Sequence, residues 1–336
     1  MENRSVRITG PGAVVAAVPS LCGFVPQESL VAICLQGPRR RIGLTLRVDL
    51  PAVRDDVVGV AELAARLEHE QPAAVVLVVC TDAAGDRPHQ ELLDRLCDAL
   101  DDVHVLDRLL LRSGRWRSYD CDDLTCCPAD GQPVPEPAAA LVAEAAYGGR
   151  AVLPDRAALA ASFAPPAWLA ARVAEQQLDE AMEQWLLSVA DQGLDAARRD
   201  AVAAVRDALA FEVRAEPAEA ASLVAGLQDV VVRDEVATLA LDDTEALLSL
   251  LLALARQSVA PYDVPVCTLV ALVAWVRGDG ALANVALDRA LAGDPAYSMA
   301  LLLRTGLDGQ LRPKAVREWL EQTRSVLRPR RKGTAA

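Results

Sequence analysis

The sequence contains few aromatic residues and almost no lysine. Aromatic residues make up 4% of the 336 positions and hydrophobic residues 52%, so a core must be built mainly from Ala, Val and Leu. Lysine occurs only at Lys314 and Lys332, which leaves 34 − 2 = 32 arginines. Such a bias is typical of a GC-rich genome and carries no information on function. Length and hydrophobic content together predict two folded domains, on the usual prior of about 100–200 residues each.

Long apolar runs and an excess of positive charge are also missing. The stretch Val264–Val276 is shorter than the roughly 20 residues that a membrane-spanning helix needs, and the first residues do not resemble a secretion signal. We therefore expect a soluble, cytoplasmic protein with reduced cysteines and no membrane contact. The formal net charge of −13 argues against nucleic acid as a partner. The basic run Arg328–Lys332 is expected to be solvated, and residues 329–336 are expected to form a basic, disordered tail.

The common catalytic motifs are absent as well. The sequence contains no GxSxG elbow, HExxH pair, GxxxxGK[ST] phosphate loop or GxGxxG dinucleotide loop. The histidines His69, His89 and His104 stand alone, and Ser118 and Ser162 lack a neighbouring His/Asp pattern. These absences remove the commonest hydrolase, metalloprotease, ATPase and dehydrogenase interpretations. They favour a protein that is not an enzyme, without excluding an unfamiliar one.

The first 130 residues alternate between strand and helix patterns. Apolar alternation between Ile42 and Val48 predicts a strand with one buried face, and the continuous apolar run Ala73–Cys80 predicts a strand at the centre of a sheet. Together the patterns predict an α/β sandwich with a mixed sheet. The expected helices are Pro11–Leu21, Asp55–Glu70 and His89–Leu100, and the expected strands are Ser29–Leu35, Arg41–Asp49, Ala73–Cys80, Val103–Leu111 and Arg115–Tyr119.

A proline-rich joint at 131–164, with short helices that include one near Ala138–Ala146, leads to a second domain. From 165 to 328 the pattern is helical throughout, which predicts an all-α domain. One helical hairpin there resembles half of a tetratricopeptide repeat, through Gly278-Asp279, Ala283, Leu287, Ala290-Leu291 and Asp294-Pro295. A single copy favours a close-packed hairpin over a repeat array. The expected helices are 169–189, 196–211, 217–227, 243–256, 265–276, 280–291, 297–307 and 313–327.

Several short motifs resemble an actinobacterial family known only as domain of unknown function 4192. The resemblance extends over essentially the whole chain. It implies membership of that family and no assigned activity. Its motifs are Gly23-Phe24-x-Pro26-x-x-Ser29-Leu30-Val31, Arg47-Val48-Asp49-Leu50-Pro51, Trp116-x-Ser118-Tyr119-x-Cys121, Cys126-Cys127-Pro128 to Gly131, and Gly149-Arg150-x-x-Leu153-Pro154-x-Arg156.

The least ordinary local chemistry is a group of three thiols at Cys121, Cys126 and Cys127. Three thiols can supply three of the four tetrahedral ligands of zinc, with Cys80 or Cys97 as the fourth. No CxxC pair and no neighbouring histidine supports this. The alternatives are a disulfide between Cys121 and Cys126, or thiols that only pack beneath the hairpin. The last is favoured, so we expect no cofactor and retain zinc as an alternative.

A second candidate is a polar set formed by Glu28, Ser29, Arg47 and Asp49. A hairpin between the two strands that carry them would bring these groups to one edge of the sheet. They could then hold a small polar ligand, or a divalent cation through Glu28 and Asp49. The simpler alternative is an ion pair between Arg47 and a neighbouring acid, with Ser29 closing a turn.

Two arginines in the joint, Arg150 and Arg156, are candidates to bind an anion between the domains. A bridge to acidic residues of the first domain is the favoured alternative. For the whole chain we carry two functional hypotheses. The first is a non-catalytic binding or scaffold protein whose helical half offers a groove to a protein partner or to a second copy. The second is an enzyme or small-ligand sensor that uses the polar set.

Overall fold

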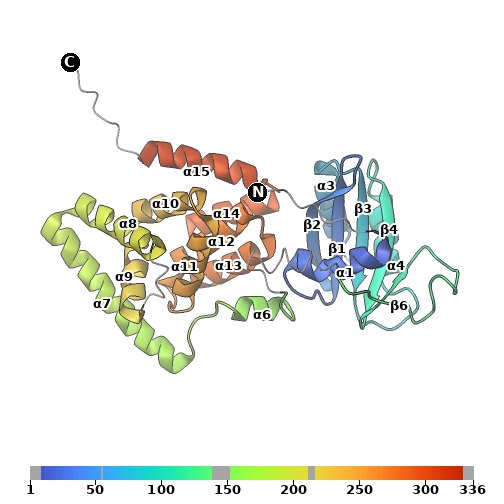
Figure 1. Cartoon of the computed structure of the whole chain (residues 1–336), viewed down its shortest axis with the longest axis horizontal. Helices are drawn as coiled ribbons and strands as arrows, with labels where there is room; N and C mark the ends of the chain where they lie inside the picture. The colour runs from blue at the N-terminus through green and yellow to red at the C-terminus, as the bar shows by residue number, and fades with distance from the viewer. Residues whose placement is uncertain (1–8, 54–55, 138–151, 211–215, 328–336) are drawn as a thin grey trace, which may run out of the picture. The chain divides into compact units, whose positions relative to one another are not determined.

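The computed structural model describes residues 9–53, 56–137, 152–210 and 216–327 (Figure 1). The chain divides into two compact units, Met1–Ala158 and Leu159–Ala336. Each unit has its own hydrophobic core, and the cores are built from Ala, Val and Leu as the composition predicts. The predicted helix near Ala138–Ala146, Arg150 and the basic tail lie outside the described residues.

The first unit is built on a mixed sheet of six strands in the order β2-β1-β3-β4-β5-β6. β1 runs antiparallel to both β2 and β3, whereas β3 and β4 are parallel. The fully buried β3 lies inside the sheet, as its continuous apolar run predicts. The strands are β1 (Ser29–Gln36), β2 (Arg41–Asp49), β3 (Ala74–Cys80), β4 (Val105–Arg112), β5 (Arg115–Ser118) and β6 (Gln132–Pro133).

Helices cover both faces of this sheet (Figure 1). On one face, Val15 of α1 (Pro11–Cys22) clusters with Val31 and Val78. On the other face, residues such as Leu77 pack against α3 (Val57–His69) and α4 (Gln90–Asp98). A short helix, α2 (Leu50–Val53), follows β2 directly. The layers therefore form the α/β sandwich that the strand and helix patterns predict.

The hairpin between β4 and β5 turns at Ser113-Gly114, between the strands expected at Val103–Leu111 and Arg115–Tyr119. Both residues have positive φ, 48° for Ser113 and 72° for Gly114. Two successive left-handed residues form the type I′ turn that suits a two-residue hairpin. The turn lies at the carboxyl end of β4, beside the loop that follows the parallel strand β3.

All the secondary-structure elements that the structure describes in the second unit are helices. α6 (Arg156–Ala161) leads into it, and the Asp155 carboxylate caps this helix by accepting from the backbone N of Ala158 at 2.6 Å. Arg156 is the first residue of α6. The other helices are α7 (Trp168–Gln192), α8 (Leu194–Ala210), α9 (Pro217–Gly226), α10 (Val230–Thr238), the 3-10 turn η1 (Leu239–Leu241), α11 (Thr244–Ala255), α12 (Asp263–Arg277), α13 (Gly280–Gly293), α14 (Ser298–Asp308) and α15 (Pro313–Leu327).

α10 is an α-helix of the second unit that the sequence patterns did not predict. It begins with three valines, and β-branched residues have low helix propensity. Asp229 overrides this preference because its carboxylate accepts from the backbone N of Val231 at 2.9 Å and of Val232 at 3.1 Å. Arg198 of α8 fixes the same carboxylate through two contacts of 2.9 Å. The N-cap and its arginine therefore form this helix end in spite of the valines.

α12 forms the centre of the helical core, with every residue from Asp263 to Val276 buried. It forms a close hairpin with α13 around Gly278, which has a left-handed φ of 90°. The Asp279 carboxylate caps α13 at the backbone N of Leu282, 3.0 Å away. The predicted hairpin is present, and its relation to tetratricopeptide repeats stays a prediction.

Arg289 of α13 ties several chain segments together inside this core. Its Nε donates to the buried Asp263 carboxylate at 2.9 Å. Its remaining nitrogens donate to the carbonyls of Phe163, Ala255 and Ser258, the last two at 3.0 Å. One guanidinium therefore joins α13 to the start of α12, the end of α11 and the segment after α6.

Candidate functional site

Arg47 connects three features at the carboxyl end of β2. Its Nε donates to the Oγ of Ser29 at 2.9 Å, and its Nη2 donates to Asp49 Oδ1 at 2.5 Å. Its guanidinium carbon lies 5.7 Å from the centre of the Phe24 ring. The strand register produces this grouping, because β1 and β2 pair Ser29 with Asp49 and Val31 with Arg47. Three members of the predicted polar set are therefore brought together.

The grouping is satisfied from within the protein. Ser29 is fully buried, and its hydroxyl donates to the Gln27 carbonyl at 2.6 Å while accepting from Arg47. The Arg47 side chain is 18% exposed, against 59% for Asp49. This is the ion pair that the simpler sequence interpretation contained, with Ser29 bonded locally. These contacts hold the start of β1 against the end of β2.

Glu28, the fourth member of the predicted polar set, makes its hydrogen bonds to a different part of the chain. It has a positive φ of 41°, and its backbone carbonyl accepts from the backbone N of Leu50 at 2.9 Å. Its Oε1 accepts from the hydroxyl of Thr81 at 2.7 Å and from the backbone N of Asp82 at 3.2 Å. Glu28 therefore ties the start of β1 to the loop that follows β3.

The sequence analysis did not identify the residues that hold the loop after β3 at this edge of the sheet. Arg112 donates to the carbonyls of Ala83 and Gly85, both at 2.9 Å, and the hydroxyl of Ser113 donates to Asp82 at 2.8 Å. The carboxyl ends of adjacent parallel strands meet at one edge, and such edges often hold ligands. A prediction that β3 and β4 pair in parallel would have identified these residues, because it places the residues that follow both strands at the same edge. Here their polar groups hold the loop after β3.

Replacing Arg47 with Ala should destabilise the first unit by about 1–3 kcal/mol, because the buried Ser29 hydroxyl loses its charged donor. The exposed partner is the matched control, since Asp49→Asn should change stability by less than about 0.5 kcal/mol. Chemical denaturation of both variants measures the two effects. Equal losses would show that the exposed ion pair, rather than the buried contact, holds the strands.

Within the described residues, the three predicted thiols form the one group of three or more side chains placed to hold a metal ion. The sulfur atoms of Cys121, Cys126 and Cys127 all lie within 4.8 Å of one another. Cys127 is buried, Cys121 is partly buried and Cys126 is exposed. All three lie in the loop between β5 and β6.

The two cysteines considered as a fourth ligand are not members of this group. Burial raises the pKa of the Cys80 thiol to about 12, with Cys22 beside it and Arg47 opposing the rise. Burial also raises the pKa of the Cys97 thiol, which lies near Arg108. Cys80 is a core residue of the sheet and Cys97 a partly buried residue of α4, and neither lies in the group of three thiols.

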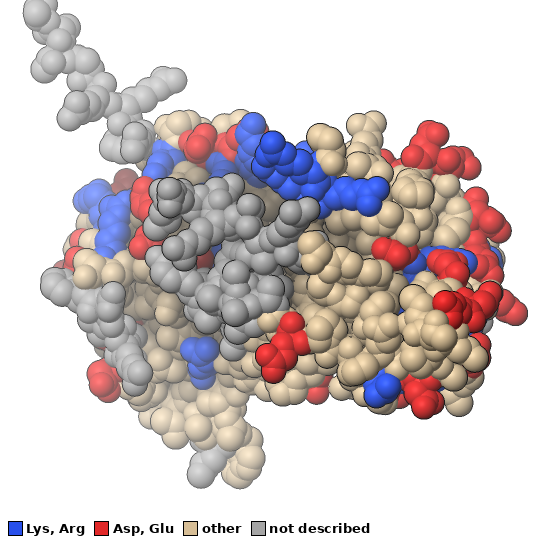
Figure 2. Space-filling model, turned by 45° about the vertical axis from the view of Figure 1, so that its right-hand side comes forward, with Lys and Arg blue, Asp and Glu red and all other residues tan. Residues whose placement is uncertain are grey.

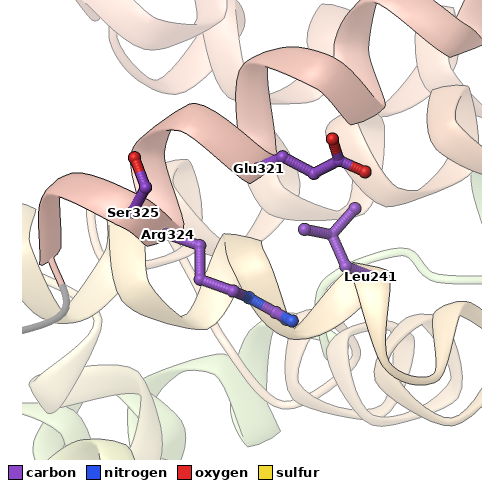
Figure 3. Close-up of a pocket in the computed structure, with 4 residues that line it drawn as sticks. All are labelled: Leu241, Glu321, Arg324 and Ser325. Carbon is purple, nitrogen blue, oxygen red and sulfur yellow. The ribbon is translucent and has the colours of Figure 1, made fainter.

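The helical unit has a shallow depression between α15 and η1 (Figure 3). It is lined by Leu241, Glu321, Arg324 and Ser325. Figure 3 shows Arg324 reaching from α15 toward η1. Its guanidinium donates to both carboxylate oxygens of Asp242, at 2.8 and 2.7 Å, and to the Thr238 carbonyl. Since the cation is engaged with the protein, this depression is a weak candidate for an anion site.

The surface is acidic overall, in line with the formal net charge of −13. On the face that Figure 2 shows, acidic side chains are concentrated toward the right-hand edge, and basic side chains form smaller groups nearer the top. Among the described helices, none is long and apolar enough to cross a membrane. The predictions about nucleic acid and cellular location stay predictions.

Comparison with known proteins identifies a family and no relative of known activity. A family model described as domain of unknown function (DUF4192) matches residues 11–314. The match includes the polar set, the thiol loop and nearly all of the helical unit. No curated protein and no solved structure matches the chain.

Proposed function

Since the chain belongs to the DUF4192 family, which has no assigned activity, its function has to be inferred from its own geometry, and we propose that it is a non-catalytic binding protein. The helical unit binds a protein partner through the outward face of α7. One observation carries this proposal. α7 exposes large apolar side chains at both of its ends, with an acidic stretch between them.

The burial of α7 separates two faces. Ala174 and Leu178 face the helical core and are buried. On the outward face, Trp168 is 74% exposed near the first turn, while Leu186 and Leu187 are 60% and 54% exposed near the last turns. Exposed apolar side chains that gather on one face, rimmed by polar residues, are typical of protein interaction sites. Residues 168, 172, 176, 179, 183, 186 and 190 follow one another at helical spacing and form a single stripe.

The net charge of α7 indicates what kind of partner this face would bind. The helix contains five acidic residues and one basic residue, Arg172, so its side chains sum to 1 − 5 = −4. An antiparallel pair of two α7 helices would place the acidic middle, near Glu180 and Glu183, against itself. Like charges that face each other destabilise an interface. The favoured partner is therefore a different protein, with a basic centre flanked by apolar side chains.

The catalytic alternative has less support from the geometry. Ser29, Arg47 and Asp49 are bonded to one another, and the carboxylate of Glu28 is bonded to Thr81 and Asp82. A substrate would have to displace these internal contacts. An exposed apolar face requires no such rearrangement.

Photo-crosslinking in the native host tests the proposal. A photoreactive residue in place of Leu187 should form crosslinks to peptides of another protein that are both basic and apolar. The added change Glu183→Lys should reduce this crosslinking about tenfold or more, because it reverses charge at the centre of the face. Crosslinked peptides are identified by mass spectrometry and quantified against total protein.

A photoreactive residue at the exposed Val58 of α3 is the matched control for nonspecific contact, since Val58 is itself 65% exposed. The same partner peptides at both positions would overturn the proposal. Crosslinks from position 187 to peptides of this same chain would also overturn it, because they would show that the face is covered by the protein itself or by a second copy.

A further inference from the structure

Three of the eight cysteines converge in one loop, and the loop is shaped by contacts that do not involve sulfur. The backbone N atoms of Cys126 and Cys127 donate to the Asp123 carbonyl, at 3.1 and 2.6 Å. The Asp123 carboxylate accepts from the backbone N and the hydroxyl of Thr125, at 2.8 and 2.7 Å. This turn directs both thiols toward Cys121. The sulfur positions are therefore set by the backbone.

The far end of the loop is fastened to β5. Arg115 donates to the carbonyl of Asp130 at 2.8 Å and to that of Gly131 at 2.7 Å. Gly131 has a left-handed φ of 75°, and a Cβ at this position would lie 2.8 Å from the carbonyl oxygen of Trp116. The side chain of Gln132 donates to the Cys126 carbonyl. Fixed ends and a formed turn keep the three thiols together at little further entropic cost.

The distances suit a metal that takes sulfur ligands. Zinc bound to sulfur at about 2.3 Å in a tetrahedron places its ligands about 3.8 Å apart. The three sulfur atoms lie within 4.8 Å of one another, so a small contraction reaches that geometry. Oxygen-seeking cations such as magnesium or calcium find no carboxylate in this group. Because Cys126 is exposed, a fourth position remains open toward solvent.

A redox or nucleophilic role fits this group less well. The three thiols lie in the loop between β5 and β6 and not at the N-terminus of a described helix. A reactive cysteine needs a lowered pKa, usually supplied by a neighbouring cation or a helix N-terminus. A metal requires no such help, because it displaces the protons of the thiols that it binds.

We propose that Cys121, Cys126 and Cys127 bind one zinc ion as three thiolates, with a fourth position open to an exchangeable ligand. On binding, each thiol forms a sulfur–zinc bond and releases its proton to solvent, with no change of oxidation state. The site belongs to the first unit and is independent of the partner-binding face proposed on α7.

Titration of the full-length, reduced, metal-free protein with Co²⁺ and then Zn²⁺ tests this site. Co²⁺ should bind at one equivalent with the intense sulfur-to-metal absorption of thiolate ligands, and Zn²⁺ should displace it. Cys126→Ser should weaken binding by at least roughly a hundredfold, which exceeds the common effect of losing an outer-sphere partner. Cys97→Ser, which alters a thiol outside the group, should leave the titration unchanged.

Cys126 is exposed, so its replacement by Ser should leave the fold intact, and circular dichroism of the variant verifies this. No thiolate absorption in the reduced wild-type protein would overturn the proposal. The same absorption in Cys126→Ser would overturn it too, because binding would then occur elsewhere. Rapid formation of a Cys121–Cys126 disulfide by protein that takes up no metal when reduced would instead establish the loop as a redox element.

Discussion

An Arg289→Ala variant should lose about 3–5 kcal/mol of stability in the helical unit, the usual cost of removing one partner from a buried ion pair. The change leaves the buried Asp263 carboxylate without its cation and deprives the carbonyls of Phe163, Ala255 and Ser258 of their donor. Denaturant unfolding followed by helical circular dichroism measures the loss. Arg206→Ala is the matched control, because its ion pair with Glu235 is exposed and should contribute less than about 1 kcal/mol.

The pH dependence of this loss of stability shows whether it arises from an unpaired buried charge or from lost packing. Burial raises the pKa of the Asp263 carboxyl, and Arg289 opposes the rise. Without Arg289 this pKa rises further, so the folded variant keeps a proton that the unfolded chain has released. The stability that this proton contributes is fully present at pH values below the pKa of Asp263 in the unfolded chain. It is lost as the pH rises through the pKa of Asp263 in the folded variant. The deficit of Arg289→Ala relative to wild type should therefore grow from acidic to neutral pH. A second change, Asp263→Asn, should abolish this trend, and a deficit independent of pH would contradict the account.

A Trp275→Ala variant should also lose about 3–5 kcal/mol, since it removes the largest side chain from the end of the central helix. Trp275 is buried, and its ring fills the space beside Gly306, where a Cβ would lie 2.7 Å from the ring. Its indole Nε1 donates to the Leu311 carbonyl at 3.1 Å. The side chain therefore joins α12 to α14 and to the segment before α15. Denaturant unfolding of the full-length chain measures the loss.

Two further variants test how much the packing of the Trp275 ring contributes. Trp275→Phe keeps most of the ring and should cost less than Trp275→Ala. Gly306→Ala should destabilise the wild-type protein by collision with the ring, but much less in the Trp275→Ala background, where a cavity accepts the methyl group. Strict additivity of the two changes would refute the proposed contact. Trp319→Ala, on the partly exposed face of α15, should have a smaller effect.

The fold could be predicted where one physical signal dominated. The apolar run that became β3 indicated a strand inside the sheet. The alternation in β2 correctly placed Leu44, Leu46 and Val48 against the core, but Ile42 is exposed because the strand pairing shifts register before it. Ser113-Gly114 satisfied a turn that demands two left-handed residues. α10 escaped prediction because its three valines oppose a helix, and the contacts that overcome them come from Asp229 and from Arg198 on another helix.

The candidate site was only partly predictable, for reasons of backbone geometry. A spacing of two along β2 was enough to place Arg47 and Asp49 on one side, where they form an ion pair. Glu28 was grouped with them by its position in the sequence. Its positive φ, which glutamate seldom adopts, accompanies a contact with Thr81 and Asp82 instead. The convergence of the three thiols depends on a turn at Asp123 that thiol spacing alone does not reveal.

The order of the strands has a consequence for how copies of this protein meet. β2 and β6 form the two edges of the sheet, and an exposed edge invites pairing with a strand of another molecule. β2 begins with Arg41 after the exposed Arg39 and Arg40, so two such edges paired in parallel would repel each other at that end. β6 is two residues long and contains Pro133, which lacks a backbone N–H. Growth into fibres through the sheet is therefore discouraged.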